Sequence, residues 1–100
     1  MMLTDAEIQI IKDLCTDHKV SKLFVIGSVL TDRFTMDSDI DFVVNFANVS
    51  LYDYAKNYYQ LKNSLEALFK RRVDLLEDQA LDVNPFLRES IDSSKQLIYG

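Results

Sequence analysis

Residues 22–45 read KLFVIGSVLTDRFTMDSDIDFVVN, and this stretch decides the fold. The apolar run Lys22–Ile26 predicts a strand that turns at Gly27. The residues from Ser28 to Arg33 predict a short helix. Asp39–Asn45 predicts a second strand, so the stretch is expected to form strand, turn, helix and strand in succession.

The side chains of the second predicted strand alternate between two faces. One face carries Asp39, Asp41 and Val43, and the other carries Ile40, Phe42 and Val44. Asp41 therefore lies within a run that otherwise predicts burial. A carboxylate at such a position is costly unless a cation or several hydrogen-bond donors satisfy it.

Two longer helices are predicted on either side of this stretch. Thr4-Asp5-Ala6-Glu7 is a capping box, and the helix that it begins is expected to reach about Asp17. Ser50 begins the longest helix, which is expected to end near Phe69 or Lys70. The buried stripes predicted from helical spacing are Ile8, Ile11, Leu14 and Cys15 in the first helix, and Leu51, Tyr54, Ala55, Tyr58, Leu61, Leu65, Leu68 and Phe69 in the second.

The last quarter of the chain predicts three further elements. Arg72–Leu76 predicts a third strand with Asp74 on the same face as Arg72. Pro85 suits the first turn of a short helix through Asp92, and Leu97–Tyr99 predicts a last strand or a tail packed on the sheet. The order α-β-α-β-α-β-α favours a small α/β (α+β) fold, in which a mixed sheet packs with helices in a single domain of residues 1–100.

Composition excludes several classes of protein. One hundred residues suffice for one hydrophobic core. No apolar run is long enough to span a bilayer and no secretory signal is visible, so a cytoplasmic protein is expected. Cys15 is the only cysteine, which excludes an internal disulfide. The net charge of −5, with only a short basic cluster at Lys70-Arg71-Arg72, argues against long nucleic acid as a partner.

The acidic residues indicate a metal site. Asp39 and Asp41 share a strand face, and Asp74 can complete the group if the second and third strands are neighbours and Asp74 is level with the pair. Carboxylate oxygens suit Mg²⁺, and two ions about 3.5–4 Å apart can neutralise charge during phosphoryl chemistry. The alternative is a solvated turn at Asp37-Ser38-Asp39 with edge-strand acids at Asp41 and Asp74, and the pair alone favours neither reading.

The Gly27-Ser28 turn is a candidate phosphate site. Glycine permits positive φ and a close approach of the backbone to a ligand. The amides at the start of the following helix suit a phosphate, and the Ser28 hydroxyl adds a donor. Taken alone, a Gly-Ser pair is more often an ordinary strand-to-helix turn with serine as the N-cap.

Together these features resemble a known family. Gly27-Ser28, ten further residues that end in Ser38, and then Asp39-Ile40-Asp41 look like the minimal nucleotidyltransferases of the DNA polymerase β superfamily. Arg72-Val73-Asp74-Leu75 resembles the strand that carries the family's third acid. The resemblance implies that Gly27 and Ser28 bind the triphosphate of an NTP, expected to be ATP. It also implies that Asp39, Asp41 and Asp74 bind Mg²⁺ as two ions, and that Asp74 helps to deprotonate the acceptor.

The segment after Ser28 departs from the family pattern. The family often continues with x-Ala-Arg-Gly, whereas this chain has Val29-Leu30-Thr31-Asp32. An acid thus replaces the second glycine. Arg33 is the arginine nearest to the usual place and is the candidate for nucleotide binding.

The resemblance also implies a partner. A chain of this length has little room for an acceptor-binding domain, so the acceptor is expected on another chain. The family includes antitoxins that act with a small helical HEPN protein, both by masking it and by attaching AMP to it. The alternatives are a non-catalytic module of the same fold that neutralises such a partner by contact, and a homo-oligomeric enzyme. Tyr52 and Tyr59 lie off the buried stripe and are candidate partner contacts, although they can equally cover the sheet edge.

Overall fold

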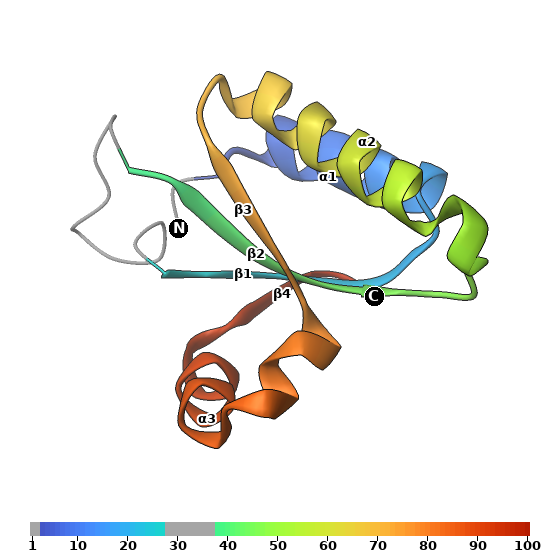
Figure 1. Cartoon of the computed structure of the whole chain (residues 1–100). Coiled ribbons are helices and arrows are strands. Elements are labelled where there is room, and N and C mark those ends of the chain that lie inside the picture. Colours follow the sequence, from blue (N-terminus) through green and yellow to red (C-terminus); the bar gives the residue numbers. More distant parts are fainter. Residues whose placement is uncertain (1–2, 28–37) are drawn as a thin grey trace.

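A computed structural model describes residues 3–27 and 38–100, and in this part of the chain the sheet has four strands. Its spatial order is β3-β2-β1-β4 (Figure 1). The strands are β1 (Val20–Ile26), β2 (Ile40–Phe46), β3 (Val73–Glu77) and β4 (Gln96–Tyr99). β1 pairs antiparallel with β2 and β4, whereas β2 and β3 run parallel. This mixed sheet with helices confirms the predicted fold class. The helix predicted at Ser28–Arg33 lies outside the described residues.

Helices cover both faces of the sheet. Figure 1 shows α1 (Asp5–Asp17) and α2 (Leu51–Phe69) together on one face, with α3 (Pro85–Ser94) on the other. Because side chains alternate between the two faces of each strand, the sheet has one hydrophobic core on each face. Ile40, Phe42 and Val44 belong to the larger core beneath α1 and α2, while Val43 packs with Ile26 and with Leu81 and Ile91 on the opposite face.

The helix boundaries follow from their caps. Thr4 and Glu7 form the predicted capping box at the start of α1. Ser50 accepts a hydrogen bond from the amide of Asp53 at the start of α2, and Lys70 ends that helix in the left-handed conformation with φ 53°. Pro85 is in the first turn of α3, as predicted. Local chemistry therefore fixes these ends.

Some of the predicted details are wrong. Leu51 and Ala55 were expected on the buried stripe of α2, but both are exposed, Leu51 by 95%. Helical spacing identifies a face without showing how far along the helix that face is covered, and in α2 the fully buried positions begin only at Leu61. The strands also begin or end one or two residues from the predicted bounds.

One element was not predicted. The 3₁₀ helix η2 (Asp78–Val83) connects β3 to α3, and Leu81 is its only buried residue. A single apolar anchor gives no periodicity to detect. In residues 3–27 and 38–100, no helix is long and apolar enough to cross a membrane.

Candidate active site

The predicted acids meet at one end of the sheet. Asp41 is directly opposite Asp74 in the parallel register of β2 and β3, and it is opposite Ile26 in the antiparallel register with β1. Asp39 lies immediately before β2. The condition set by the sequence is therefore met: the second and third strands are neighbours and Asp74 is level with the pair. We call Asp39, Asp41 and Asp74 the acidic trio.

The carboxyl of Asp41 is strongly perturbed by its surroundings. Burial raises its pKa from 3.8 to about 6, and a hydrogen bond with Asp74 and repulsion from Asp74 and Asp39 act in the same direction. The strand neighbours Ile40 and Phe42 are buried, so the fold holds Asp41 at this position. The structure thus keeps an acid where the protein alone stabilises its charge poorly.

Gly27 lies against this carboxylate. Its φ is +79°, a conformation that L side chains rarely adopt. A Cβ placed on Gly27 would lie 2.7 Å from Oδ2 of Asp41, closer than real contacts allow. The left-handed backbone therefore favours glycine here, and any larger residue would also have to displace the Asp41 carboxylate. The Gly27-Ser28 turn, predicted to bind phosphate, thus begins beside Asp41, which was predicted to bind metal.

Two arginines of the β3 side approach the trio. Nε of Arg72 lies 3.8 Å from Oδ1 of Asp74 and 4.0 Å from Oδ2 of Asp39. Arg71 donates a hydrogen bond of 2.9 Å to the backbone carbonyl of Ser38, next to Asp39. Strand alternation predicts Arg72 on the face of Asp74, but no role was predicted for it. Its spacing of two residues from Asp74 on a strand was the available signal.

The donor set suits Mg²⁺ in its chemistry. The three carboxylates supply hard oxygen ligands, and after burial and the hydrogen bond with Asp74, repulsion from Asp74 and Asp39 also raises the pKa of Asp41. Within residues 3–27 and 38–100, however, no three His, Cys, Asp or Glu side chains are grouped so that they could hold a metal ion as they stand. Chelation by the trio therefore requires its side chains to reorient. Of the other predicted site residues, Ser28 and Arg33 lie outside the described residues.

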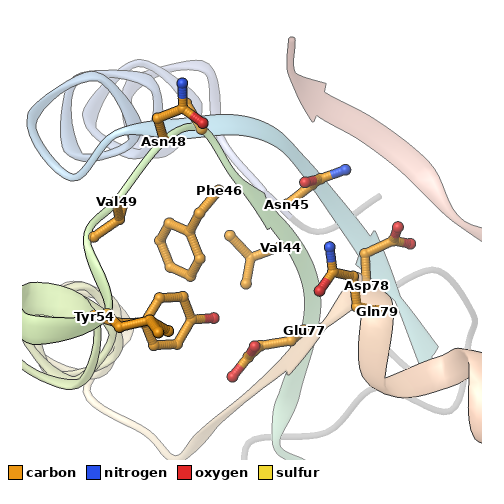
Figure 2. Close-up of a pocket in the computed structure, with 11 residues that line it drawn as sticks. Val44, Asn45, Phe46, Asn48, Val49, Tyr54, Glu77, Asp78 and Gln79 are labelled. Atoms are coloured by element: carbon orange, nitrogen blue, oxygen red, sulfur yellow. The ribbon is translucent and has the colours of Figure 1, made fainter.

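A cavity of about 360 Å³ lies at the other end of β2 and β3. Figure 2 shows Tyr54 and Glu77 on its wall together with Asn45, Asn48 and Gln79. Burial, and next the hydrogen bond to Glu77, raise the pKa of Tyr54 above its usual value. Tyr54 was predicted as a core residue and is only partly buried. The cavity includes none of the acidic trio.

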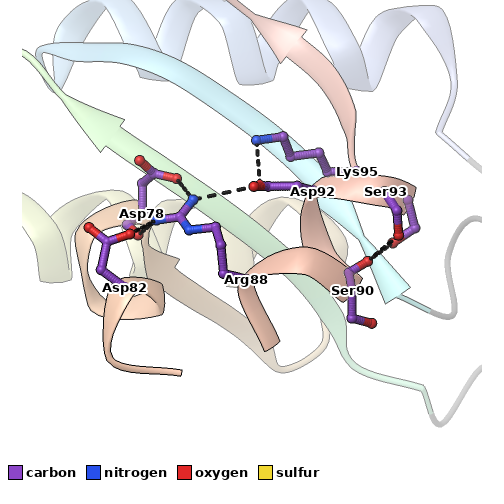
Figure 3. A network of polar contacts seen from close by, with 8 residues as sticks. Asp78, Asp82, Arg88, Ser90, Asp92, Ser93 and Lys95 are labelled. Carbon is purple, nitrogen blue, oxygen red and sulfur yellow. Dashed lines mark hydrogen bonds and ion pairs between the residues drawn. The ribbon is translucent and has the colours of Figure 1, made fainter. Parts of the chain in front are cut away.

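A second polar cluster lies on the α3 face. Arg88 approaches Asp78 at 2.7 Å and Asp82 at 2.8 Å, and it lies 3.6 Å from Asp92 (Figure 3). These contacts connect η2 to α3. Hydrogen bonds to the two nearest acids raise the pKa of Arg88, so its charge is permanent. This cluster is a structural clamp, and it includes none of the acidic trio.

The chain is similar to known proteins over most of its length. The "Nucleotidyltransferase domain" family matches residues 7–98. A protein of Methanocaldococcus jannaschii named "Putative protein adenylyltransferase MJ0128" is 34% identical over 88 residues, which cover 88% of this chain and 84% of that protein. A second from the same organism, "Putative protein adenylyltransferase MJ1379", is 32% identical over 91 residues, covering 91% of this chain and 84% of that protein.

Solved structures share the fold. One described as "Structure of putative minimal nucleotidyltransferase" superposes with a TM-score of 0.75 at 30% identity, covering 91% of this chain and 88% of that chain. A toxin–antitoxin structure with AMP-PNP gives 0.70 at 19% identity, covering 97% of this chain and 74% of that one. The toxin–antitoxin MntA-HepT gives 0.66 at 20% identity, covering 97% and 73%. The match over nearly the whole chain shows that this protein belongs to the nucleotidyltransferase domain family.

Proposed function

We propose that this chain is a Mg²⁺-dependent adenylyltransferase that moves AMP from ATP to a hydroxyl group on a partner protein. The observation that carries the proposal is the register that places Asp41 opposite Asp74 and beside Gly27. The names of the relatives from Methanocaldococcus jannaschii, at 34% and 32% identity, support AMP as the group transferred and protein as the acceptor.

In this proposal each site residue has a distinct role. Gly27 and Ser28 bind the triphosphate, with Arg33 as a further nucleotide-binding residue. Asp39, Asp41 and Asp74 hold Mg²⁺, which when bound neutralises charge on the phosphates. Asp74 accepts the proton of the acceptor hydroxyl. The acceptor oxygen then forms a bond to the α-phosphorus, the bond from that phosphorus to the β-phosphate oxygen breaks, and pyrophosphate leaves.

The proposed partner is a small helical HEPN-type toxin, for which this chain would be the antitoxin. The toxin–antitoxin structures that share the fold support this assignment. The chain also exposes apolar side chains that a partner could cover. Tyr52 is 97% exposed, and Val83 at the end of η2 and Phe86 in the first turn of α3 are 88% and 86% exposed. Tyr59, the other predicted contact, is 58% exposed.

A direct test is Asp41→Asn. Loss of one Mg²⁺ ligand should raise the barrier to transfer by roughly several kcal/mol, because the metal would no longer stabilise the developing charge. The rate of AMP transfer should therefore fall by orders of magnitude. The assay uses labelled ATP, Mg²⁺ and the product of the neighbouring gene as the candidate acceptor. Asp17→Asn, an exposed acid at the end of α1, is the matched control and should transfer AMP at the normal rate. Normal transfer by Asp41→Asn would refute the site assignment.

Asp74→Asn refines the assignment of roles. It should impair transfer more than ATP binding, because the Mg²⁺ ion that would hold the triphosphate depends mainly on Asp39 and Asp41. ATP binding is read from the rise in melting temperature with Mg-ATP, which follows from mass action on the folded state. Equal loss of binding and transfer would assign Asp74 to the fold rather than to proton transfer.

One observation favours a second function, that of a non-catalytic module that neutralises its partner by contact. Arg72 already supplies positive charge to Asp39 and Asp74, and the described side chains are not grouped for chelation as they stand. This module would suppress the toxin with no AMP on it. Mass analysis of the partner after co-expression separates the two functions: a gain of one AMP supports transfer, and suppression without that gain supports the contact module.

A further inference from the structure

Arg72 is held differently from the structural arginine of this chain. Both of its acid contacts, 3.8 and 4.0 Å, are longer than a hydrogen bond, and its side chain is 72% exposed. Arg88 makes contacts of 2.7 and 2.8 Å, and its side chain is only 23% exposed. Arg72 is therefore loosely held between two acids, whereas Arg88 is locked.

The position of Arg72 follows from the strand. It precedes β3 and is two residues from Asp74, so both side chains point to the same side of the sheet. Its backbone carbonyl accepts a hydrogen bond of 3.2 Å from the amide of Ile40, which fixes the start of β2 beside it. The guanidinium is thus directed at the acidic trio by the same register that pairs Asp41 with Asp74.

Arg72 contacts only part of the trio. Its Nε is within 4.0 Å of Asp39 and Asp74, and no such contact joins it to Asp41, the acid beside Gly27. A cation at the β3 side of the trio would need the oxygens that Arg72 now faces. A cation on the Gly27 side would not meet this competition.

We propose that Arg72 is the resident counter-ion of the acidic trio and competes with a divalent cation for Asp39 and Asp74. The inference rests on the proposed function, because it takes the trio as the cation site. Arg72 limits repulsion in the cation-free protein and must leave when the cation binds. An exposed ion pair is weak enough to be displaced at little cost. The residue therefore sets how much divalent cation the site requires.

The test measures the affinity for Mn²⁺ alone, from the spin resonance signal of the free ion, in the full chain. Arg72→Gln should bind Mn²⁺ roughly three- to tenfold more tightly than the wild type, the range expected when one or two exposed ion pairs no longer compete. Arg72→Lys should remain near the wild type. Lys70→Gln, which removes the same charge from the same turn without touching the trio, is the matched control and should leave affinity unchanged.

A melt in EDTA gives an independent readout. Without cation, Arg72→Gln should melt a few degrees below the wild type, because the trio has lost its counter-ion. With saturating Mn²⁺ the difference should vanish or reverse. An arginine with a merely structural role would lower the melting temperature equally in both conditions and leave the Mn²⁺ affinity unchanged, and that result would overturn the inference.

The two proposals fail in different ways. If the wild type binds Mn²⁺, Asp41→Asn does not, and Arg72→Gln binds as the wild type does, then only the counter-ion role falls. If neither the wild type nor Arg72→Gln binds Mn²⁺ at millimolar concentration, the cation site itself is absent and both proposals fall.

Discussion

Gly27 shows how closely single residues of the site constrain one another. Gly27→Ala would place a methyl group 2.7 Å from Oδ2 of Asp41 and hold alanine at φ +79°. The strain should cost about 1–2 kcal/mol of folding free energy, and the displaced carboxylate should bind Mn²⁺ less tightly. Thermal melts and Mn²⁺ titrations measure the two effects.

A second background separates the clash from the backbone strain. Asp41→Ala removes the carboxylate that the new methyl group would meet, so adding Gly27→Ala to it should cost less than Gly27→Ala costs in the wild type. Equal costs in the two backgrounds would show that only the left-handed backbone matters. Gly27→Ala with the stability of the wild type would contradict the described turn.

Asp41 should give the fold a distinctive dependence on pH. Its pKa is raised from 3.8 to about 6 in the folded chain, so between these values the folded state binds more protons than the unfolded state. The contribution of Asp41 to stability is therefore greatest when it is protonated, falls as pH rises from about 4 to about 6, and stays constant above that.

Asp41→Asn removes this titration. The stability of Asp41→Asn relative to the wild type, measured by urea unfolding in EDTA, should increase from pH 4 to pH 6, since the ordinary and folded pKa values lie near these limits. Asparagine preserves the shape and can still donate a hydrogen bond to Asp74. If the mutant were less stable than the wild type at pH 7 in EDTA, Asp41 would be a satisfied structural acid.

At the scale of elements, α2 is attached to β3 by a side chain. The Tyr58 hydroxyl donates a hydrogen bond to the backbone carbonyl of Leu75, one residue beyond Asp74. Tyr58→Phe should destabilise the domain by about 1 kcal/mol, the usual contribution of such a bond. Urea unfolding checks the value. Tyr59→Phe is the matched control, because Tyr59 is 58% exposed and its ring would be retained.

The elements that sequence predicts well are those with local signals. Thr4 and Ser50 mark two helix starts because their hydroxyl groups accept hydrogen bonds from backbone amides three residues later, and Pro85 marks a third start. Alternation in Asp39–Asn45 gave the correct division of faces, because a half-buried strand has a period of two residues. The partner of a strand has no such local signal. From the sequence, Asp74 could join the pair only on the condition that the second and third strands are neighbours. The structure supplies the parallel register that places Asp74 opposite Asp41.

What escaped prediction depends on contacts between distant elements. The cavity that Tyr54 and Glu77 line forms only when α2 lies over β2 and β3, so helical spacing alone assigned Tyr54 to the core. The role of Arg72 depends on Asp39, which another strand supplies. The metal site, its ligands and the nucleotide-binding residues Ser28 and Arg33 stay predictions until the substitutions are measured.

At the scale of the whole molecule, the sheet separates two cores that are held in different ways. The larger core beneath α1 and α2 is apolar, while the smaller one beneath α3 is supplemented by the Arg88 clamp. Arg88→Gln should lower the melting temperature by several degrees, because Asp78, Asp82 and Asp92 would be left facing one another. Mn²⁺ affinity should not change.

Lys12→Gln, on the exposed side of α1, removes the same charge and should melt as the wild type does. Hydrogen exchange should show the added opening of Arg88→Gln confined to η2 and α3. Faster exchange throughout α1 and α2 would show instead that the two faces unfold as one unit.

The parallel pairing of β2 with β3 has a consequence for damaged copies of the protein. Asp41 and Asp74 become neighbours only because α2 returns the chain to the same end of the sheet. A protease cut within that return would leave β2 and β3 joined only by non-covalent contacts. The approach of Asp41 to Asp74 would then depend on the sheet pairing and on the packing of α2 alone, so nicked protein should lose this approach more readily than intact protein does.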